Sequence, residues 1–281
     1  MDFNMNDMND TNNQINSNNI IIKIESFLQT TKITSNSQFG NLIKELITNF
    51  GKEYLFKLFE SNLQQKIFVY IRHAESVKNE KKKLGIYHKE NIIENYDPII
   101  TQKGKEECIK ALDKLNEIKI NFDIVYISPL SRAIQTFAEL KQSNYFTNKN
   151  NNYIISPLIR ETLKNSTQVG SRLSQLRTIY NNLELNFDYI IKEKWWNFEK
   201  IENEDVNQIE NIIGETEPDV LLRVRIFLIW CVLRKESNIC IIAHSNIYCL
   251  LTSQREHKLK NAEVELLKNE GLLENIKSIL Q

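Results

Sequence analysis

The stretch "IFVYIRHAESVKNE", residues 67–80, decides the fold of this chain. Its first residues are all aliphatic or aromatic, which predicts a buried strand. Arg72 and His73 follow that strand at once. In a mainly parallel sheet, the side chains that follow the strands gather at the carboxyl edge, where ligands bind. The stretch therefore predicts a sheet edge that presents an arginine and a histidine to a ligand.

The rest of the chain alternates short β-branched runs with longer amphipathic runs. This alternation predicts an α/β protein, a three-layer sandwich in which helices cover both faces of a mainly parallel sheet. We expect its main strands at residues 67–71, 123–127, 153–156 and 238–243.

Helix signals lie between these strands. Thr101 is expected to cap a helix over residues 101–118, because a threonine at this position can accept a hydrogen bond from the first turn. A second helix is expected over residues 128–140, with Ser128 as its N-cap. A third, nearly all apolar, is expected over residues 219–236 and should pack against the sheet.

Composition divides the chain into four segments. Residues 1–19 are rich in asparagine and poor in aliphatic side chains, which predicts a disordered tail. Residues 20–65 form a predicted helical extension, packed either on the main domain or on a partner. Residues 66–270 form the predicted catalytic domain, and residues 271–281 a C-terminal tail. Within the domain, the polar segment 162–217 fits neither pattern and is expected to cover the active site.

The global charge gives no sign of a polyanionic partner. The chain has 36 lysines and arginines and 36 aspartates and glutamates, so neither nucleic acid nor a membrane surface is expected to bind it. The four cysteines lack the spacing of metal ligands and are expected to be buried thiols. The longest apolar run, 226–233, is far shorter than the about 20 residues of a membrane span, and no signal peptide is visible. We expect a cytoplasmic protein.

Polar side chains of one kind follow several of the predicted strands. The set contains two histidines, several arginines and one carboxylate: Arg72, His73, Arg132, Arg160, Glu161 and His244. A phosphomonoester is a dianion, and the planar fork of an arginine can hold two of its oxygens at once. Arg72 and Arg132 suit that role. The sequence therefore predicts a pocket for a phosphoryl group.

The histidines and the carboxylate match the chemistry of such a pocket. A neutral imidazole at His73 can act as the nucleophile, because nearby arginines disfavour its charged form. Glu161 can protonate the departing alcohol if its environment raises its pKa. His244, expected to be protonated, would stabilise charge on the transferring phosphoryl group.

At this point the ordered motifs resemble a known family. "RHAES", "YDPIITQKG", "SPLSRAIQT", "LIRE", "GETEPDVLLRV", "ICIIAHS" and "NAEV" occur in the order found in the histidine phosphatase superfamily, the phosphoglycerate mutase-like proteins. The resemblance covers about residues 66–267. It implies the phosphoglycerate mutase-like fold, with an edge strand at residues 262–267 where periodicity alone would favour a helix.

The resemblance also assigns roles to single residues. It implies that His73 becomes phosphorylated, that Arg72, Arg132 and His244 complete the phosphate pocket, and that Glu161 is the proton donor. Asn79 matches a phosphate-contacting asparagine, and Ser76 a polar residue that lines the site. Ala74 and Ser245 stand where the family usually has glycine, and Ser245 is expected to contact the substrate.

The expected activity is that of a metal-independent phosphatase without a cofactor, acting on a phosphorylated small molecule or protein through a phosphohistidine on His73. Two alternatives stay open. One is a phosphoglycerate mutase, in which the phosphoenzyme passes its group to a second hydroxyl. The other is a pseudoenzyme that binds a phosphorylated ligand without turnover, with residues 20–65 as a docking module. Trp195 and Trp196 are expected either to line a lid or to cover apolar surface, and His88 and His257 to be exposed.

Overall fold

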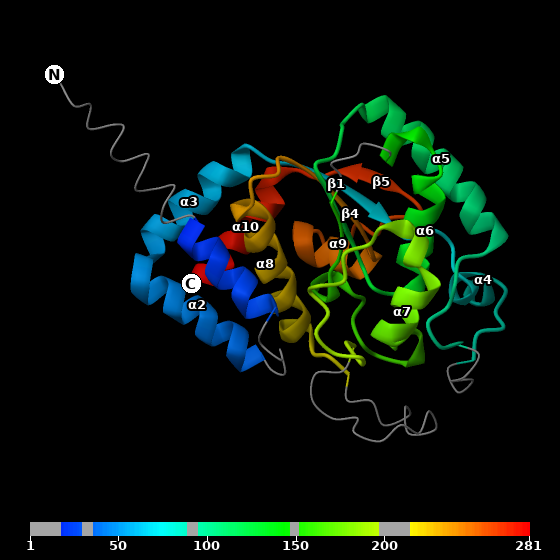
Figure 1. The fold of residues 1–281 in the computed structure, drawn as a ribbon, viewed down its shortest axis with the longest axis horizontal. Helices are drawn as coiled ribbons and strands as arrows, with labels where there is room; N and C mark the ends of the chain where they lie inside the picture. Colours follow the sequence, from blue (N-terminus) through cyan, green and yellow to red (C-terminus); the bar gives the residue numbers. More distant parts are fainter. Residues whose placement is uncertain (1–17, 30–35, 89–94, 147–151, 197–213) are drawn as a thin grey trace.

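The structure is a computed structural model that describes residues 18–29, 36–88, 95–146, 152–196 and 214–281. Within these residues, five strands form one sheet in the order β3-β2-β4-β1-β5 (Figure 1). Their bounds are β1 Ile67–Arg72, β2 Ile124–Ile127, β3 Asn152–Ile155, β4 Asn238–Ala243 and β5 Val264–Leu266. The first four are parallel, and β5 runs antiparallel to β1 at the edge. The predicted α/β class and the predicted edge strand are both confirmed.

The pairing of β1 with β4 sets the position of the two site histidines. Arg72 lies opposite Ala243 in this parallel pair. The next residue, His73, donates its backbone N–H to Ala243 O at 2.9 Å. His73 and His244 therefore leave neighbouring strands at the same edge of the sheet.

Helices cover both faces of the sheet, because each strand alternates apolar side chains between them. Phe68 and Tyr70 belong to the core on one face, and Val69 and Ile71 to the core on the other. The first face is covered by α8 and α9, and the second by α5 and α6, which lie on opposite sides in Figure 1. The bounds are α5 Gln102–Ile118, α6 Ser131–Lys141, α8 Glu217–Leu233 and α9 Ser245–Thr252.

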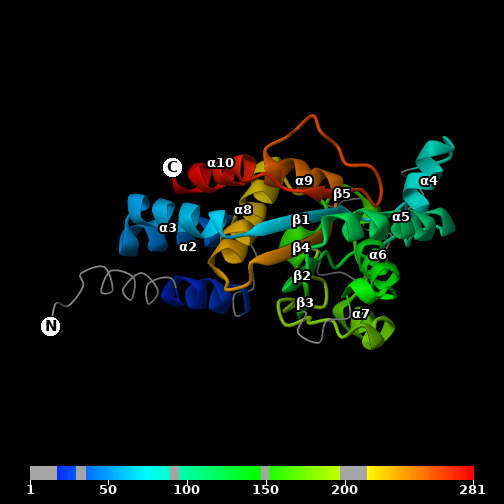
Figure 2. The ribbon, with the colours of Figure 1, turned by 90° about the horizontal axis from the view of Figure 1, so that it is seen from above.

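The helical extension packs on the main domain. It consists of a helix over residues 18–29, α2 Asn36–Phe50 and α3 Lys52–Gln64. Gly51, with a φ of +79°, separates α2 from α3 in a backbone conformation that favours glycine. Leu46 of α2 and Leu55 of α3 are buried in the same core as α8. Figure 2 shows α2 and α3 beside α8 and α10, so the apolar face of the extension is covered within this chain.

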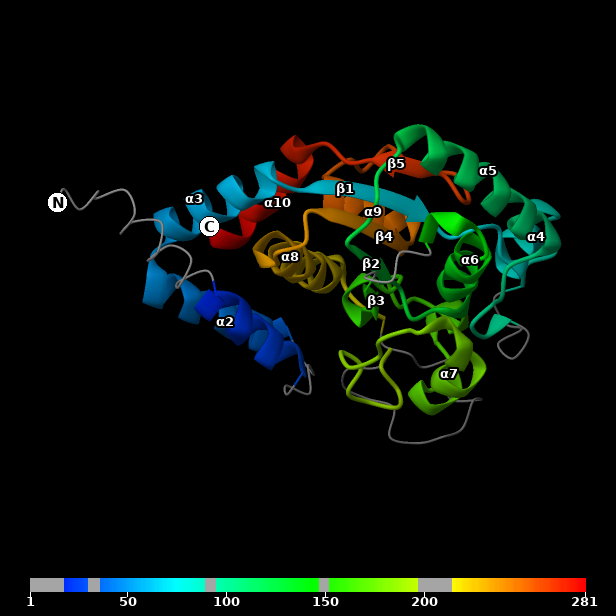
Figure 3. The same cartoon turned by 45° about the horizontal axis from the view of Figure 1, so that its top comes forward.

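The expectation of a C-terminal tail at residues 271–281 is wrong. These residues belong to α10, Asn269–Leu280, which lies beside α3 in Figure 3. Leu272, Ile276 and Leu280 recur every fourth residue, so they form one apolar stripe, and all three are buried. Asn275 Nδ2 also donates to Leu250 O at 2.9 Å and so binds α10 to α9.

Two helices begin at other residues than predicted, and both differences have a cause in their capping. Helix α6 begins at Ser131 rather than Ser128, because its first amide is capped from a distant loop: Ser131 N donates to Asp97 Oδ1 at 2.9 Å. Helix α8 begins at Glu217, because Thr216 and Asp219 form a reciprocal capping box. Thr101 caps α5 as predicted and accepts from Gly104 N at 3.0 Å.

The predicted insertion contains short elements. These are a 3-10 turn at Ser166–Gln168, α7 Leu173–Ile179 and a further 3-10 turn at Asn181–Leu183. Residues 197–213 of this insertion lie outside the described residues. So do residues 1–17 of the expected disordered tail, whereas residues 18 and 19 already belong to the first helix. Among the helices that the structure describes, none has both the length and the apolar composition needed to cross a membrane.

The first prediction tests the role of α10. Leu272→Ala should lower the free energy of unfolding by about 2 to 5 kcal/mol, because Leu272 is fully buried and its truncation leaves a cavity. Urea unfolding would measure this. Leu84→Ala is the matched control, since Leu84 is 65% exposed, and its effect should stay within about 0.5 kcal/mol. Equal effects of the two variants would mean that α10 does not pack on the core.

Candidate active site

The ends of β1, β2 and β4 bring the predicted residues together at the carboxyl edge of the sheet. The rings of His73 and His244 lie 5.1 Å apart between centroids and are tilted by 59°. Arg132, in the first turn of α6, places its Nε 3.3 Å from Nε2 of His73. Because β1, β2 and β4 are parallel neighbours, three segments far apart in the sequence meet at one point.

The contacts of His73 define its protonation state. Its Nδ1 lies 2.8 Å from Ala74 O, and a carbonyl oxygen can only accept a hydrogen bond, so Nδ1 carries the proton. Nε2 is then unprotonated and accepts from Arg132 Nε. Burial, and next the charges of Arg132 and Arg72, hold the pKa of His73 well below its usual value. The sequence-based expectation of a neutral imidazole is met.

His244 is fully buried and is also neutral. Its Nε2 lies 2.8 Å from Ser128 Oγ, while its Nδ1 is buried without a partner among the described residues. Burial, followed by Arg132 and His73, holds the pKa of His244 well below its usual value. The cations beside His244 thus disfavour a proton on it, and its protonation beside a phosphoryl group stays a prediction.

Three polar atoms at this edge are buried without a hydrogen-bond partner in the part of the chain that the structure describes. They are Arg72 Nε, His244 Nδ1 and Ser245 Oγ. Buried polar atoms are almost always paired in folded proteins. Their concentration at one place points to a polar ligand. Arg72 is itself fixed by a hydrogen bond of 2.6 Å from its Nη1 to Leu259 O.

Glu161 faces the same pocket. It is half-buried, and its Oε1 accepts a hydrogen bond from Thr162 N at 2.8 Å. After burial, its charge is the strongest influence on the pKa values of Arg72 and Arg132, and it raises both. The carboxylate thus lies close enough to the cations to act on a ligand that they hold.

Asn79 and Ser76 act together at the start of α4, Val77–Lys83. Asn79 Oδ1 accepts from Ser76 N at 3.1 Å and from Ser76 Oγ at 2.8 Å, and the two residues form the capping box of α4. Asn261 Nδ2 reaches both Asn79 Oδ1, at 3.3 Å, and His73 O, at 3.2 Å. The oxygen of Asn79 therefore stabilises the loop after His73.

The loop after His73 packs against the N-terminal end of α5. Thr101 N donates to Glu75 O at 2.9 Å, and Glu75 also pairs with Lys83. A Cβ at Gly104 would lie only 2.4 Å from Glu75 O. Glycine at this position lets α5 approach the backbone that carries His73.

Arg160 is not part of the phosphate pocket, in contrast to its place in the predicted set. It is buried and pairs with Glu215 at the far end of the insertion. Glu215 also accepts from Arg223 Nε at 3.0 Å and from Leu163 N at 3.0 Å. These contacts fasten the two ends of the insertion to each other and to α8.

Sequence reasoning missed several contacts at the site. Lys78 Nζ donates to Thr167 Oγ1 at 2.6 Å, and Arg132 Nη1 donates to Thr167 O at 2.9 Å. Ser128, predicted only as a cap, contacts His244 instead. Asp97 lies in the quoted motif "YDPIITQKG", but its capping of α6 requires the folded chain. Within the described residues, no group of three or more His, Cys, Asp or Glu side chains is arranged to hold a metal ion.

The tryptophan pair packs inside the insertion. Trp195 and Trp196 are both buried and make an edge contact with ring centroids 5.4 Å apart. Trp195 Nε1 donates to Ser171 O at 2.9 Å. Of the two explanations considered, the cover for apolar surface is the one observed. His88 and His257 are exposed, as expected.

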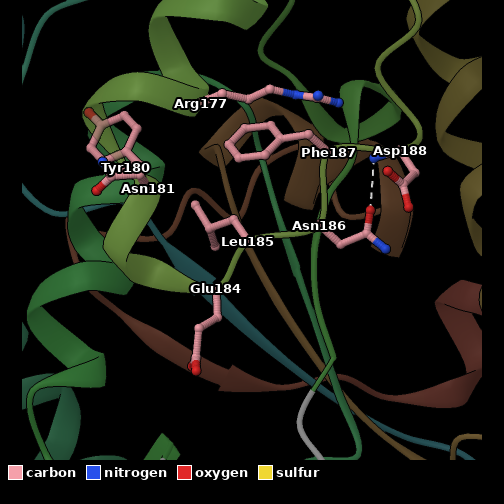
Figure 4. Close-up of a pocket in the computed structure, with 8 residues that line it drawn as sticks. All are labelled: Arg177, Tyr180, Asn181, Glu184, Leu185, Asn186, Phe187 and Asp188. Carbon is pink, nitrogen blue, oxygen red and sulfur yellow. Dashed lines mark hydrogen bonds between the residues drawn. The ribbon is translucent and has the colours of Figure 1, made fainter.

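A separate cavity of about 420 Å³ lies on the outer part of the insertion. Figure 4 shows that its lining combines both charges, aromatic rings and amides: Arg177, Tyr180, Asn181, Glu184, Leu185, Asn186, Phe187 and Asp188. It contains none of the predicted site residues. This cavity is therefore separate from the candidate site at the carboxyl edge of the sheet.

The fold and the candidate site define an α/β protein with two histidines and two arginines at the carboxyl edge of its sheet. The family model described as "Histidine phosphatase superfamily (branch 1)" matches residues 68–162. This match confirms the resemblance to that superfamily that the motifs indicate. A 2,3-bisphosphoglycerate-dependent phosphoglycerate mutase from Bartonella henselae is 38% identical over 73 residues, which are 26% of this chain. The match spans 31% of the length of that mutase.

Solved structures with a similar trace include a mycobacterial glucosyl-3-phosphoglycerate phosphatase complexed with VO3. It is 16% identical, with a TM-score of 0.43, over 72% of this chain and 92% of that chain. Another is a phosphoserine phosphatase from Entamoeba histolytica in complex with 3-phosphoglyceric acid. It is 16% identical, with a TM-score of 0.38, over 74% of this chain and 99% of that chain.

The second prediction concerns Glu215. Burial alone would raise its pKa, but Arg160 and Arg223 lower the pKa to about 2. Glu215→Gln should therefore lower the free energy of unfolding at pH 7 by about 3 kcal/mol, because it leaves two buried guanidinium groups without an anion. Urea unfolding would measure the loss, with the exposed Glu117→Gln as the control.

The free energies of unfolding of the wild type and of Glu215→Gln should also differ in their dependence on pH. A carboxylate whose folded pKa is lowered stabilises the fold above its ordinary pKa, and this stabilisation is lost as the pH falls from about 4.5 toward about 2. The wild type should therefore lose more stability than Glu215→Gln between pH 5 and pH 3. A constant gap between the two curves over this range would contradict the ion pairing.

Proposed function

We propose that this protein hydrolyses a phosphomonoester through a phosphohistidine on His73. The observation that carries the proposal is the pair of contacts on that ring. Ala74 O fixes the proton on Nδ1, and Arg132 Nε lies beside the free Nε2. A phosphoryl oxygen bound to Arg132 would then lie within reach of the nucleophilic nitrogen.

The binding step uses the fixed cations. Arg72 and Arg132 would hold the equatorial oxygens of the dianion, and the unpaired Ser245 Oγ would add a donor. Both guanidinium groups are held by backbone carbonyls, of Leu259 and Thr167 respectively, so little reorganisation is needed when the ligand arrives. The bound dianion would raise the pKa of His244, so the protonated form becomes accessible in the complex.

The chemical step exchanges one P–O bond for one P–N bond. Nε2 of His73 attacks phosphorus in line with the alcohol, which departs with its bonding pair and takes a proton from Glu161. In the second half, Glu161 removes a proton from water, which attacks phosphorus and breaks the P–N bond. His73 returns to its neutral state, with Glu161 protonated again. No residue outside this chain is needed for either half.

A phosphoglycerate mutase activity is the second candidate, because the mutase from Bartonella henselae shares 38% identity over 73 residues. In a mutase, the phosphoenzyme transfers its group to a second hydroxyl in place of water. The two activities differ in the fate of the phosphoenzyme. Release of inorganic phosphate without an added acceptor supports the phosphatase.

The four buried free thiols support a reducing, cytoplasmic setting.

The third prediction tests the nucleophile. His73→Ala should abolish turnover of an aryl phosphate, because the other histidine at this edge, His244, has its Nε2 engaged by Ser128. Release of aryl alcohol, measured with a chelator present, gives the rate. Mass spectrometry of the rapidly quenched wild type should place one phosphate on His73.

His257→Ala is the matched control, because His257 is an exposed histidine outside the pocket. It should retain the wild-type rate. Turnover by His73→Ala above a few per cent of the wild type would overturn the mechanism. Binding of the phosphate ester with neither turnover nor a phosphoenzyme would favour the binding-only alternative.

The fourth prediction tests the proton donor. Glu161→Gln should slow hydrolysis of an alkyl phosphate by about 100-fold or more, since an alkoxide needs a proton to depart. It should slow p-nitrophenyl phosphate far less, because that leaving group is stable as an anion. Steady-state rates on both substrates give the ratio. Equal losses on the two substrates would assign the proton to another group.

A further inference from the structure

Lys78 occupies a position that the chemistry above does not use. It lies in the first turn of α4, between the two residues of the capping box that follows His73. Its side chain is half-buried and reaches across to the insertion, where Nζ donates to Thr167 Oγ1 at 2.6 Å. Arg132 donates to the carbonyl of the same threonine. Two cations from α4 and α6 thus converge on one residue of the insertion.

The charged groups around Lys78 place it at the pocket. Those that act on it are Arg132 of α6, Glu161 after β3, and Lys82 one turn along α4. Lys78 in turn disfavours the charged form of His73. The Tyr87 ring lies 5.9 Å from Nζ on the outer side. Lys78 and Arg132 thus contact the same threonine of the insertion, and Arg132 in turn contacts His73, which links Lys78 to the candidate site.

The positive charges at the candidate site exceed the negative charge of a phosphomonoester by one. Arg72, Arg132 and Lys78 contribute three positive charges, even before a bound dianion allows His244 to gain a proton. A phosphomonoester dianion balances two of them when Glu161 is protonated to serve as the acid. An ammonium group half-buried beside a guanidinium is unfavourable unless an anion compensates it. One further negative charge on the ligand would balance the site.

We propose that Lys78 and Thr167 form a subsite for a second anionic group, so that the substrate is a phosphomonoester whose alcohol carries a carboxylate or another acidic group. This inference rests on the proposed function, because it takes Arg72 and Arg132 to hold the phosphoryl group. Lys78 selects the substrate and takes no part in the transfer.

The charge of this subsite depends on pH. Burial, and next Arg132, lower the pKa of Lys78 to about 7, while Glu161 opposes the shift. The ammonium form, and with it the attraction for a second anion, is present below this pKa and is lost above it. A bound carboxylate would raise the pKa again, so the loss should be complete only near pH 9.

The test uses inert ligands, so that it does not depend on turnover. Calorimetry would compare 3- and 4-carboxyphenylphosphonate with their carboxylate methyl esters, which have the same shape without the second charge. At pH 6, at least one acid should bind about tenfold more tightly than its ester, the size expected of one charge-assisted hydrogen bond. At pH 9 the ratio should approach one. The ratio cancels the titration of the phosphonate itself.

Three variants assign the effect. Lys78→Met should bring the ratio at pH 6 to about one. Lys78→Arg should keep the advantage and extend it to pH 9, because a guanidinium stays charged there. Lys110→Met, which removes an exposed lysine of α5, should match the wild type.

A wild-type ratio near one for both acids, or an unchanged ratio in Lys78→Met, would overturn the subsite. If phenyl phosphate is still hydrolysed in that case, the proposed function stands alone. If the Lys78-dependent ratio is found but no phosphate ester turns over, the subsite stands and the hydrolysis fails. If the wild type binds no phosphonate at all, both the subsite and the proposed function are contradicted.

Discussion

The parallel pairing of β1 with β4 is the constraint on which the rest of the site depends. The hydrogen bond from His73 N to Ala243 O continues this pairing one residue beyond β1. It fixes the backbones of His73 and His244 side by side, and the neighbouring β2 then brings Ser128 to His244. A slip of one residue in this register would turn each side chain to the opposite face of the sheet. Apolar side chains on both faces of β1 oppose such a slip, so core packing and catalytic geometry are set by the same register.

Electrostatics at the edge work against stability and in favour of binding. Arg72 and Arg132 stand beside two buried imidazoles, and the structure accommodates them by keeping both rings neutral. The cost of burying these cations is met by backbone carbonyls and by Glu161 rather than by close ion pairs. The buried arginines Arg160 and Arg223 are neutralised differently. Glu215 lies between their two guanidinium groups and forms an ion pair with each. The two arrangements separate arginines that are paired within the fold from arginines that lie at the candidate site, although the sequence presents them alike.

The sequence predicted those parts of the site that follow directly from a strand. Arg72, His73 and His244 were identifiable because apolar β-branched runs locate the strand ends, and parallel pairing brings such ends together. It could not predict contacts whose partners lie far apart in the chain. Arg160 was placed in the pocket because its partner, Glu215, lies beyond the whole insertion. Ser128 was taken as a cap because the true cap of α6, Asp97, comes from a different loop. Leu272 and Ile276 of α10 have a clear helical period, although residues 271–281 were expected to form a tail.

The contact of Lys78 with Thr167 shows most clearly what the local sequence cannot predict. In "RHAESVKNEKK", residues 72–82, it is one polar residue among several, and nothing in that string distinguishes it from Lys81 or Lys82. Its direction is set when Ser76 and Asn79 start α4, because the capping box fixes the phase of the helix and turns residue 78 toward the insertion. The insertion is held in place by Glu215 at its base, so the contact between Lys78 and Thr167 depends on two ion-paired or capped junctions outside the pocket. In the proposed mechanism, the residues on the strand ends would stay fixed while substrate selection varied with the start of α4 and the insertion.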